Sequence, residues 1–225
     1  MAPVDPDVAA SAGSANLHTV FTAECQNPQF DWFSLGVYAS FRNAQMRGSI
    51  TRLLVSAPVC RQCVRVLQPT ERIYGAQACS PDDLANYSML DIGPTFVHPN
   101  YRHNPLNGDV SASYNKPASV MHWVREANFT EEYVLFIDAD MIINRPIDPI
   151  AMGARRGVVV SERVGYLIGT HNGLAEEFIP EDAVPRAKPV GWYHIFHRDD
   201  LREIAPLWLK YCGEVPRYVA EMAYC

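Results

Sequence analysis

The sequence predicts an α/β domain in which a mostly parallel central sheet is flanked by helices. Two observations support this prediction. Short apolar segments rich in β-branched residues alternate with segments of helical periodicity, the pattern of successive βαβ units. In addition, two aspartates one residue apart, Asp138 and Asp140, directly follow one of the apolar segments. In open α/β sheets this is the position where ligands bind.

The first half of the chain begins with a βαβ unit. Residues 18–23 (HTVFTA) are short, β-branched and aromatic, and predict a buried strand. Asp31 is placed to cap a helix whose apolar stripe, at positions i, i+3, i+4 and i+7, is Trp32, Leu35, Gly36 and Ala39. Residues 50–55 predict a second strand, parallel to the first. Residues 57–113 contain many Pro, Asn, Asp and Gly residues, so we expect an irregular excursion with one short strand near 95–97.

The second half continues the alternation. The Asn-Lys-Pro sequence at 115–117 predicts a helix start, with the asparagine as cap and the proline at the first helical position. This helix leads into an apolar strand over 133–137. Residues 157–161 and 190–196 predict two more strands. Asp199 then caps a last helix with the stripe Leu201, Ala205, Trp208 and Cys212.

The composition is that of a globular domain, with 48% hydrophobic and 20% charged residues in a chain of 225. We expect one domain over residues 17–225, preceded by a disordered segment over 1–16 that lacks the features of a signal peptide. The net charge of -6, without a cluster of Lys or Arg, argues against nucleic acid as a partner. No apolar run reaches the roughly 18 residues that span a bilayer, so we expect no membrane contact by this chain.

The number of cysteines does not show in which cellular compartment the protein resides. The chain has six of them, enough for up to three disulfides. Cys60 and Cys63 have the spacing of half a zinc site, but no second pair follows. We expect these two to pair with each other or with Cys79, or to remain thiols.

Asp138 and Asp140 are the candidate metal ligands. Residues two apart on a strand point to the same face, so both carboxylates can turn toward one cation. Oxygen ligands suit Mg²⁺ or Mn²⁺, which proteins often share with the phosphates of a substrate. The alternative is that the two aspartates only begin a turn, a position that Asp also favours.

Three further residues are candidates for contacting a nucleotide. Thr22 and Glu24 end the first strand, where they could bond a ribose or a base. The chain has no glycine-rich phosphate loop, so a diphosphate would need a metal and a cation. Lys116, at a helix N-terminus whose dipole also favours anions, is the natural cation. The alternative for Lys116 is a surface lysine beside a helix cap.

Two histidines end the strand predicted over 190–196. His194 and His197 are three apart, so they face opposite sides of a strand and cannot act as a strand pair. Of the two, we favour His197, because it precedes Asp199 and Asp200 at the strand's carboxyl end. The alternative is a structural histidine. No catalytic triad can be identified from spacing.

Several stretches together resemble one protein family. They are HTVFTAEC, SITRLL, YNKP, YVLFIDADMII, GYLIG and DDLREIAPLWL. In this order, over about residues 17–212, they resemble the plant and green-algal peptidyl serine α-galactosyltransferases, relatives of the hydroxyproline O-arabinosyltransferases. The arabinosyltransferase branch has Glu-Pro-Asp-His where this chain has Asp-Ala-Asp-Met at 138–141. The galactosyltransferase branch is therefore the closer match.

The resemblance implies a GT-A-like fold, the fold of nucleotide-diphospho-sugar transferases. It also implies a UDP-sugar donor, a divalent metal (Mn²⁺, or Mg²⁺) and a polypeptide acceptor rich in Ser and hydroxyproline. An α-product from an α-linked donor implies retention of configuration. The compartment implied is the lumen of the endoplasmic reticulum or Golgi.

The resemblance also assigns residues. Asp138 and Asp140 match the family's metal and catalytic motif, and His197 matches a histidine close to the reacting sugar. The other residues expected to contact the donor are Thr22, Ala23, Glu24, Lys116, Ala139, Gly191 and Trp192.

Three departures from the family pattern bear on activity. Trp192 stands where such proteins tend to have the second glycine of Val-Gly-Gly, and it could reshape the acceptor pocket. His171-Asn172 replaces Asp-Asn. The chain also ends within a partial match to the family's Glu-Met-Tyr-Gly-Tyr segment, so we expect a domain truncated at its C-terminus. The third metal ligand, which in GT-A enzymes often comes from near the C-terminus, is not identified. The alternative functions are an inactive domain that binds UDP or peptide, an arabinosyltransferase, or a metal-dependent phosphoesterase.

Overall fold

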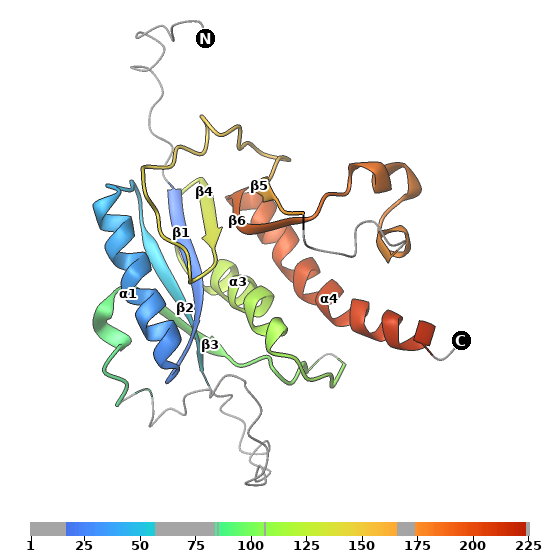
Figure 1. Cartoon of the computed structure of the whole chain (residues 1–225), viewed down its shortest axis with the longest axis horizontal. Coiled ribbons are helices and arrows are strands. Elements are labelled where there is room, and N and C mark those ends of the chain that lie inside the picture. The colour runs from blue at the N-terminus through green and yellow to red at the C-terminus, as the bar shows by residue number, and fades with distance from the viewer. Residues whose placement is uncertain (1–16, 57–83, 85, 106, 166–173, 224–225) are drawn as a thin grey trace, which may run out of the picture.

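The computed structural model describes residues 17–56, 84, 86–105, 107–165 and 174–223, with 174–175 and 216–223 as backbone only (Figure 1). The expectations for residues 1–16, for Cys60, Cys63 and Cys79, and for His171 lie outside these residues. Of the other cysteines, Cys25 is disulfide-bonded and Cys212 is a free thiol.

A six-stranded sheet forms the centre of the protein, with strand order β3-β2-β1-β4-β6-β5. The strands are β1 (Leu17–Glu24), β2 (Ile50–Ser56), β3 (Thr95–Pro99), β4 (Tyr133–Ile137), β5 (Val160–Arg163) and β6 (Val190–His197). The β1–β2 pairing is parallel, as predicted, and the β1–β4 and β2–β3 pairings are parallel too. β6 is antiparallel to both of its neighbours, so the sheet is mixed and the prediction of a mostly parallel sheet fails on this side.

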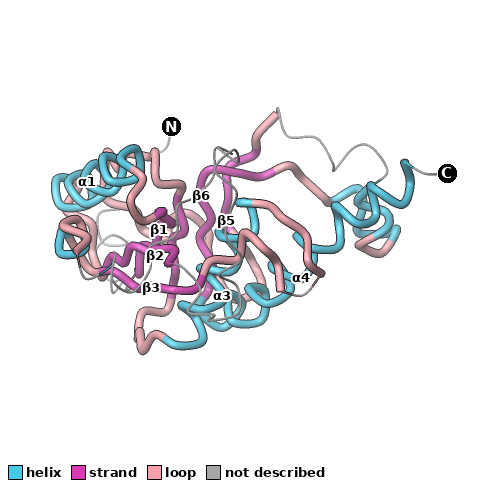
Figure 2. Tube along the Cα trace, turned by 90° about the horizontal axis from the view of Figure 1, so that it is seen from below, coloured by secondary structure: helices cyan, strands magenta, loops and turns pink. Residues whose placement is uncertain are grey.

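Helices cover both faces of the sheet. Helix α1 (Pro28–Asn43) lies on one face, and α3 (Asn115–Glu126) and α4 (Arg198–Ala223) lie on the other (Figure 2). Short 3-10 helices at Leu90–Ile92, Ala112–Tyr114, Leu174–Glu177 and Glu181–Arg186 lie in the connections. No helix among the described residues is long and apolar enough to span a membrane.

Two large hydrophobic cores fill the space between the layers, and a third, smaller cluster contains Ala23, Cys25 and Leu54. Alternate residues of β1 and β4 point to opposite faces. Phe21 and Ile137 join the core beneath α1, whereas Val20 and Phe136 join the core beneath α3 and α4. This alternation fixes the orientation of the residues that leave these two strands at their carboxyl ends.

Helix α1 begins before Asp31, its predicted cap. The side chain of Asn27 accepts a hydrogen bond from the backbone N–H of Gln29 at 3.2 Å, and Pro28 occupies the first turn, where its missing N–H leaves no bond unmade. Asp31 lies inside the helix, and its carboxylate accepts a hydrogen bond from the Tyr87 hydroxyl. The prediction was wrong because an Asn-Pro pair starts a helix more effectively than a later aspartate.

The buried face of α1 also differs from the predicted one. Trp32 is 74% exposed and Leu35 is 40% exposed, although both belong to the predicted stripe. The buried residues are Ser34, Val37, Tyr38, Ser40 and Phe41. Tyr38 anchors this face, because its ring packs edge to face on Phe21, 5.4 Å between centroids, and its hydroxyl donates to the carbonyl of Pro94 at 2.6 Å. Both stripes have helical spacing, so periodicity alone could not choose between them.

Asn115 does not cap α3. A 3-10 turn precedes the helix, and Ser111 caps that turn by accepting a hydrogen bond from the Ser113 N–H at 3.2 Å. The Asn115 side chain instead accepts a hydrogen bond from the Tyr101 N–H at 2.7 Å. It therefore ties the preceding loop to the start of α3.

The edge strand β5 starts later than the predicted strand over 157–161. Arg155 and Val158 form an isolated bridge that closes a tight turn. Within it, Gly157 has a φ of 77°, a left-handed conformation that glycine adopts without steric cost. The turn delays the strand until residue 160.

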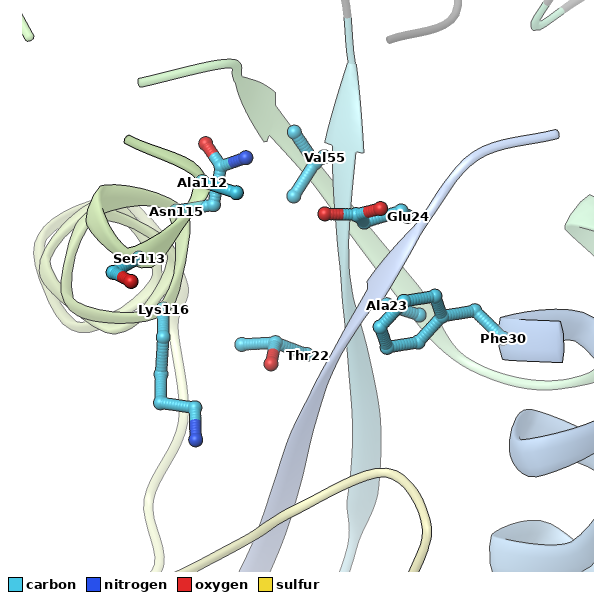
Figure 3. A pocket seen from close by; sticks show the side chains of 9 residues that line it. All are labelled: Thr22, Ala23, Glu24, Phe30, Val55, Ala112, Ser113, Asn115 and Lys116. Atoms are coloured by element: carbon cyan, nitrogen blue, oxygen red, sulfur yellow. The ribbon is translucent and has the colours of Figure 1, made fainter. Parts of the chain in front are cut away.

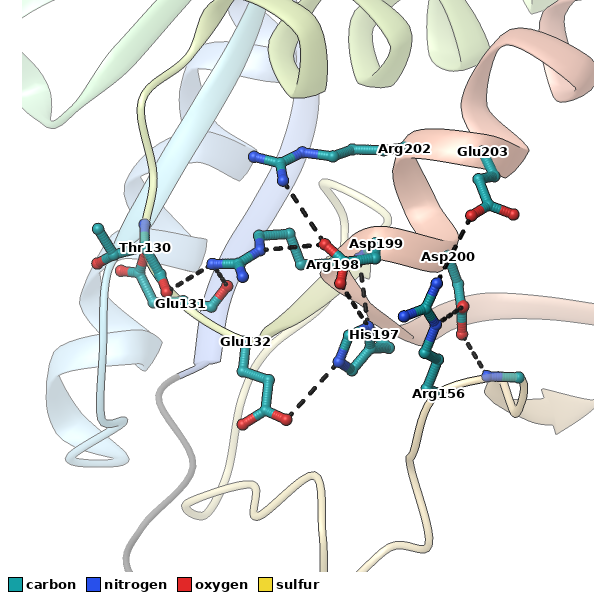
Figure 4. A network of polar contacts seen from close by, with 11 residues as sticks. Thr130, Glu131, Glu132, Arg156, His197, Arg198, Asp199, Asp200, Arg202 and Glu203 are labelled. Atoms are coloured by element: carbon teal, nitrogen blue, oxygen red, sulfur yellow. Dashed lines mark hydrogen bonds and ion pairs between the residues drawn. The ribbon is translucent and has the colours of Figure 1, made fainter.

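Helix α4 is capped by His197 and not by Asp199. Nδ1 of His197 accepts a hydrogen bond from the Asp199 N–H at 3.2 Å. In a neutral ring the proton is then on Nε2, which lies 3.6 Å from a carboxylate oxygen of Glu132. Figure 4 shows His197 within a polar network at the start of α4. In this structure His197 therefore acts as the N-cap of α4.

Replacing His197 by alanine should lower the free energy of unfolding by about 1 kcal/mol, the usual cost of losing an N-cap bond. Urea denaturation measures the change. The His197→Asn variant, with a short side chain that also caps helices well, should retain most of the stability. Equal losses in the two variants would contradict the capping role.

Candidate functional site

The four parallel strands β3, β2, β1 and β4 end at one edge of the sheet. β1 pairs in parallel with β2 on one side and with β4 on the other, so their carboxyl ends lie together. Helix α3 leads back into β4 and therefore has its first turn at the same edge (Figure 1). Segments distant in sequence converge here.

A cavity of about 390 Å³ opens at this edge. Its lining comes from the ends of β1 and β2 and from the start of α3: Thr22, Ala23, Glu24, Phe30, Val55, Ala112, Ser113, Asn115 and Lys116. Figure 3 shows Thr22 and Lys116 pointing into the space between β1 and α3. The structure thus brings together four of the residues predicted to contact a nucleotide.

The Asp-x-Asp segment forms a turn directly after β4. The N–H of Asp138 donates to the carbonyl of Trp192 at 3.1 Å, and the N–H of Met141 donates to the carbonyl of Asp138 at 3.2 Å. Ala139 is buried inside this turn, whereas Asp140 is exposed. The backbone bonds hold the turn, so the Asp138 carboxylate remains available for another partner.

That partner is Lys116. Its ammonium lies 2.5 Å from an Asp138 carboxylate oxygen, with the two side chains 42% and 28% exposed. The same ammonium lies 5.8 Å from the centre of the Phe136 ring, a cation–π contact. Lys116 therefore lines the cavity and also joins it to the Asp-x-Asp turn.

Glu24 is the carboxylate among the residues that line the cavity. Burial raises the pKa of this half-buried group above its usual 4.5, and the amide of Asn27, which donates to it at 3.5 Å, and the charge of Arg102 act in the opposite direction. An acidic group desolvated in this way suits hydrogen bonding to ligand hydroxyls. Thr22, two residues earlier in β1, adds a hydroxyl on the same face.

The residues fit a metal that is shared with a substrate. Among the described residues, no group of three or more His, Cys, Asp or Glu could hold a metal ion. Two carboxylates, Asp138 and Asp140, are nevertheless sufficient where phosphate oxygens and waters complete the shell, as is usual for Mg²⁺. A metal here would depend on the nucleotide for its remaining ligands.

Gly191 and Trp192 lie at the same edge. They belong to the start of β6, and Trp192 accepts the hydrogen bond from Asp138. Trp192 has a φ of 67° beside the irregularity in the β5–β6 pairing. This conformation favours glycine and is strained for a tryptophan. The glycine expected at this position in related proteins would relieve the strain.

His197 lies at the other end of β4. In the antiparallel β4–β6 register His197 is opposite Tyr133, the first residue of β4, whereas Asp138 follows its last residue. The carboxyl end of β6 therefore points away from the carboxyl ends of β1 and β4. The structure does not bring His197 together with the other predicted site residues.

His194 is the histidine that lies near Asp138 and Lys116. It is opposite Phe136 in the same register, and their rings stack 6.3 Å apart. Burial and the charge of Lys116 lower its pKa below 6.5, and the charge of Asp138 acts the other way. The sequence-based choice of His197 over His194 was wrong for this edge, because it took the carboxyl end of β6 to lie with those of β1 and β4. A reversal in strand direction left no mark in the local sequence.

The chain matches the model of the family described as "Hydroxyproline O-arabinosyltransferase family N-terminal domain" over residues 74–218. It is similar to a peptidyl serine alpha-galactosyltransferase of Arabidopsis thaliana, with 38% identity over 88% of this chain and 22% of the relative. A protein of the same name from Chlamydomonas reinhardtii is 31% identical over 91% of this chain and 26% of the relative. The chain thus spans about a quarter of the length of these relatives.

Hydroxyproline O-arabinosyltransferase 2 of Arabidopsis thaliana is more distant, with 28% identity over 54% of this chain and 34% of the relative. Among solved structures, a 4-diphosphocytidyl-2C-methyl-D-erythritol synthase from Anaerococcus prevotii aligns over 88% of this chain and 78% of that one, with a TM-score of 0.37 and 7% identity. That likeness is too weak to carry an argument. The match to the family covers more than half of the chain and confirms the resemblance found in the sequence. The chain belongs to the hydroxyproline O-arabinosyltransferase family.

Proposed function

We propose that this domain transfers a sugar from a nucleotide-diphosphate donor to a side-chain hydroxyl of Ser or hydroxyproline in a polypeptide. The names of the relatives support the reaction class, since all of them denote transfer of a sugar to one of these residues. The observation that carries the proposal is the contact between Lys116 and Asp138 beside the cavity. It places a cation, a carboxylate and an open pocket at one sheet edge.

We further propose UDP-galactose as the donor, with Mn²⁺ or Mg²⁺. The relatives that share 38% and 31% identity with this chain are both named for galactose transfer. Asp138 and Asp140 would hold the metal, which would supply Lewis-acid stabilisation of the charge that builds on the departing UDP. Lys116 would reach the diphosphate, and Thr22 and Glu24 would bond the ribose or base.

The transfer would proceed with retention of configuration. The bond from the anomeric carbon to the UDP oxygen breaks, and the acceptor oxygen bonds to the same face of that carbon. The acceptor hydroxyl proton passes to a donor phosphate oxygen, so no opposite-face base is needed. Two carboxylates one residue apart do not provide the cross-bond arrangement of a hydrolytic glycosidase, which supports transfer over hydrolysis.

We propose the fold type, the acceptor and the cellular compartment from the same relatives. A mixed sheet covered by helices on both faces, with its cavity at the carboxyl ends of parallel strands, is compatible with a GT-A-like fold. The acceptor would be a polypeptide rich in Ser and hydroxyproline. The compartment would be the lumen of the endoplasmic reticulum or Golgi.

Two measurements on one protein preparation test the function. Calorimetry with UDP and Mn²⁺ measures donor-site binding, and a transfer assay measures product on peptides that contain Ser next to hydroxyproline. We expect binding and galactosylated peptide. Binding without product from any UDP-sugar would indicate an inactive binding domain, arabinosylated hydroxyproline would indicate the other branch, and phosphate release without acceptor would indicate a phosphoesterase.

Replacing Asp140 by alanine should lower the rate of transfer by about 100-fold or more, because the leaving group loses its stabilisation. Asp140 is exposed, so the melting temperature should not change. The Asp182→Ala variant, which removes another exposed aspartate outside the cavity, serves as the control. Unchanged turnover of Asp140→Ala in Mn²⁺ would rule out its role.

Replacing Lys116 by methionine should change metal and nucleotide affinity in opposite directions. The ammonium competes with a metal for Asp138, so removing it should strengthen Mn²⁺ binding about two- to fivefold, in keeping with a half-exposed ion pair. UDP binding in saturating Mn²⁺ should weaken about tenfold, because the diphosphate loses a cation. Calorimetry measures both, with Lys116→Arg as the charge-conserving control. A fall in both affinities would contradict the competition.

Replacing Glu24 by glutamine should stabilise the fold at neutral pH. The folded-state pKa of Glu24 is raised, so its ionised form costs stability once the pH exceeds the usual value of 4.5. Thermal melts from pH 4 to 8 should show a gain that is absent at the acid end and grows as the pH rises. UDP affinity should fall in the same variant. A stability gain that does not depend on pH would contradict the burial of an ionised group.

A further inference from the structure

His194 has a fixed tautomer. The hydroxyl oxygen of Ser161 lies 2.7 Å from the carbonyl of Tyr193 and 2.7 Å from Nδ1 of His194. A carbonyl can only accept, so the single hydroxyl proton of Ser161 goes to Tyr193. Nδ1 must therefore donate to Ser161, and in the neutral ring the proton lies on Nδ1. Nε2 is left as a hydrogen-bond acceptor.

The environment keeps this ring neutral and in place. Burial and the nearby ammonium of Lys116 lower the pKa of His194, so the neutral form dominates at pH 7. Phe136, Phe196 and Trp208 pack around the ring, with centroids 6.3, 5.7 and 6.4 Å away. Nε2 has no hydrogen-bond partner among the residues that the structure describes.

The position of His194 relates it to the proposed donor site. Lys116 contacts both the Asp138 carboxylate and the face of Phe136, and His194 stacks on the same Phe136 ring. The imidazole therefore lies beside the groups that would hold the diphosphate, on the side of the sheet covered by α3 and α4. A sugar attached to that diphosphate would bring hydroxyl groups, which donate hydrogen bonds, into reach of such an acceptor.

We propose that Nε2 of His194 accepts a hydrogen bond from a hydroxyl of the donor sugar, and that Ser161 positions it by fixing the tautomer. The inference rests on the proposed function and adds a residue that recognises the sugar and not the nucleotide. It distinguishes His194 from His197 in the same strand, which caps α4 at the opposite edge.

Side-chain length provides a matched pair of variants. Glutamine can place its carbonyl oxygen near the position of Nε2, whereas asparagine reaches only the position of Nδ1. Calorimetry in Mn²⁺ would compare UDP with UDP-galactose for wild type, His194→Gln, His194→Asn and Ser161→Ala, with His197→Asn as the control histidine.

We expect UDP to bind all variants within about twofold of wild type. UDP-galactose should bind His194→Asn about tenfold more weakly, the size of one lost hydrogen bond, and His194→Gln should recover most of this loss. Ser161→Ala should show a smaller loss of the same kind, and the control none. An unchanged ratio of the two affinities in His194→Asn would overturn the inference while leaving the proposed function intact. A wild type that binds neither ligand would overturn both.

A measurement on the wild type avoids any dependence on variant folding. Two-bond ¹⁵N–¹H spectra of histidine-labelled protein report which ring nitrogen carries the proton. We expect His194 protonated on Nδ1, with an Nε2 resonance that shifts with UDP-galactose and Mg²⁺ but not with UDP and Mg²⁺; Mg²⁺ avoids the line broadening caused by Mn²⁺. A proton on Nε2, or equal shifts with the two ligands, would contradict the inference.

Discussion

The parallel pairing of β1 with β4 is the constraint on which the site depends. It brings the end of β1, with Thr22 and Glu24, to the same edge as the turn that begins at Asp138. Both strands are almost entirely buried and contribute to the cores on both faces, so their register cannot slip without moving apolar side chains to the wrong face. Helix α3 lies between them in sequence and delivers Lys116 to that edge. The packing of the core thus gathers a cation and three carboxylates at one place.

The reversed strand β6 completes the edge in a different way. Because it is antiparallel to β4, its start and not its end lies beside Asp138, where Trp192 accepts a backbone hydrogen bond from the turn. The same reversal places His194 near the ion pair of Lys116 and sends His197 to the start of α4. Two histidines three residues apart therefore have unrelated surroundings. One lies among aromatic rings beside charged groups, and the other lies in a surface polar network.

Much of the fold could be predicted from the sequence, because buried strands and amphipathic helices leave strong local patterns. β1, β2, β4 and β6 were all found close to their predicted bounds. The errors arose where two local patterns competed or where the answer depended on distant segments. In α1 two stripes had helical spacing, and contacts of Tyr38 with Phe21 and Pro94 selected the less obvious one. At the site, the grouping of Asp138, Lys116 and Glu24 could be predicted because the carboxyl ends of parallel strands share an edge. The direction of β6 could not be predicted in this way, because it depends on how the whole sheet is assembled. The choice of His194 over His197 could be made only from the structure.

The proposed function requires that the turn after β4 bind a divalent metal together with the diphosphate of a nucleotide. Anomalous diffraction at the manganese edge, from crystals grown with UDP and Mn²⁺, would locate this metal. We expect an anomalous peak at coordination distance from the carboxylates of Asp138 and Asp140 and from the phosphates, with the ammonium of Lys116 moved from Asp138 to the diphosphate. A manganese peak elsewhere, or UDP bound in the cavity with no metal at these two aspartates, would contradict it.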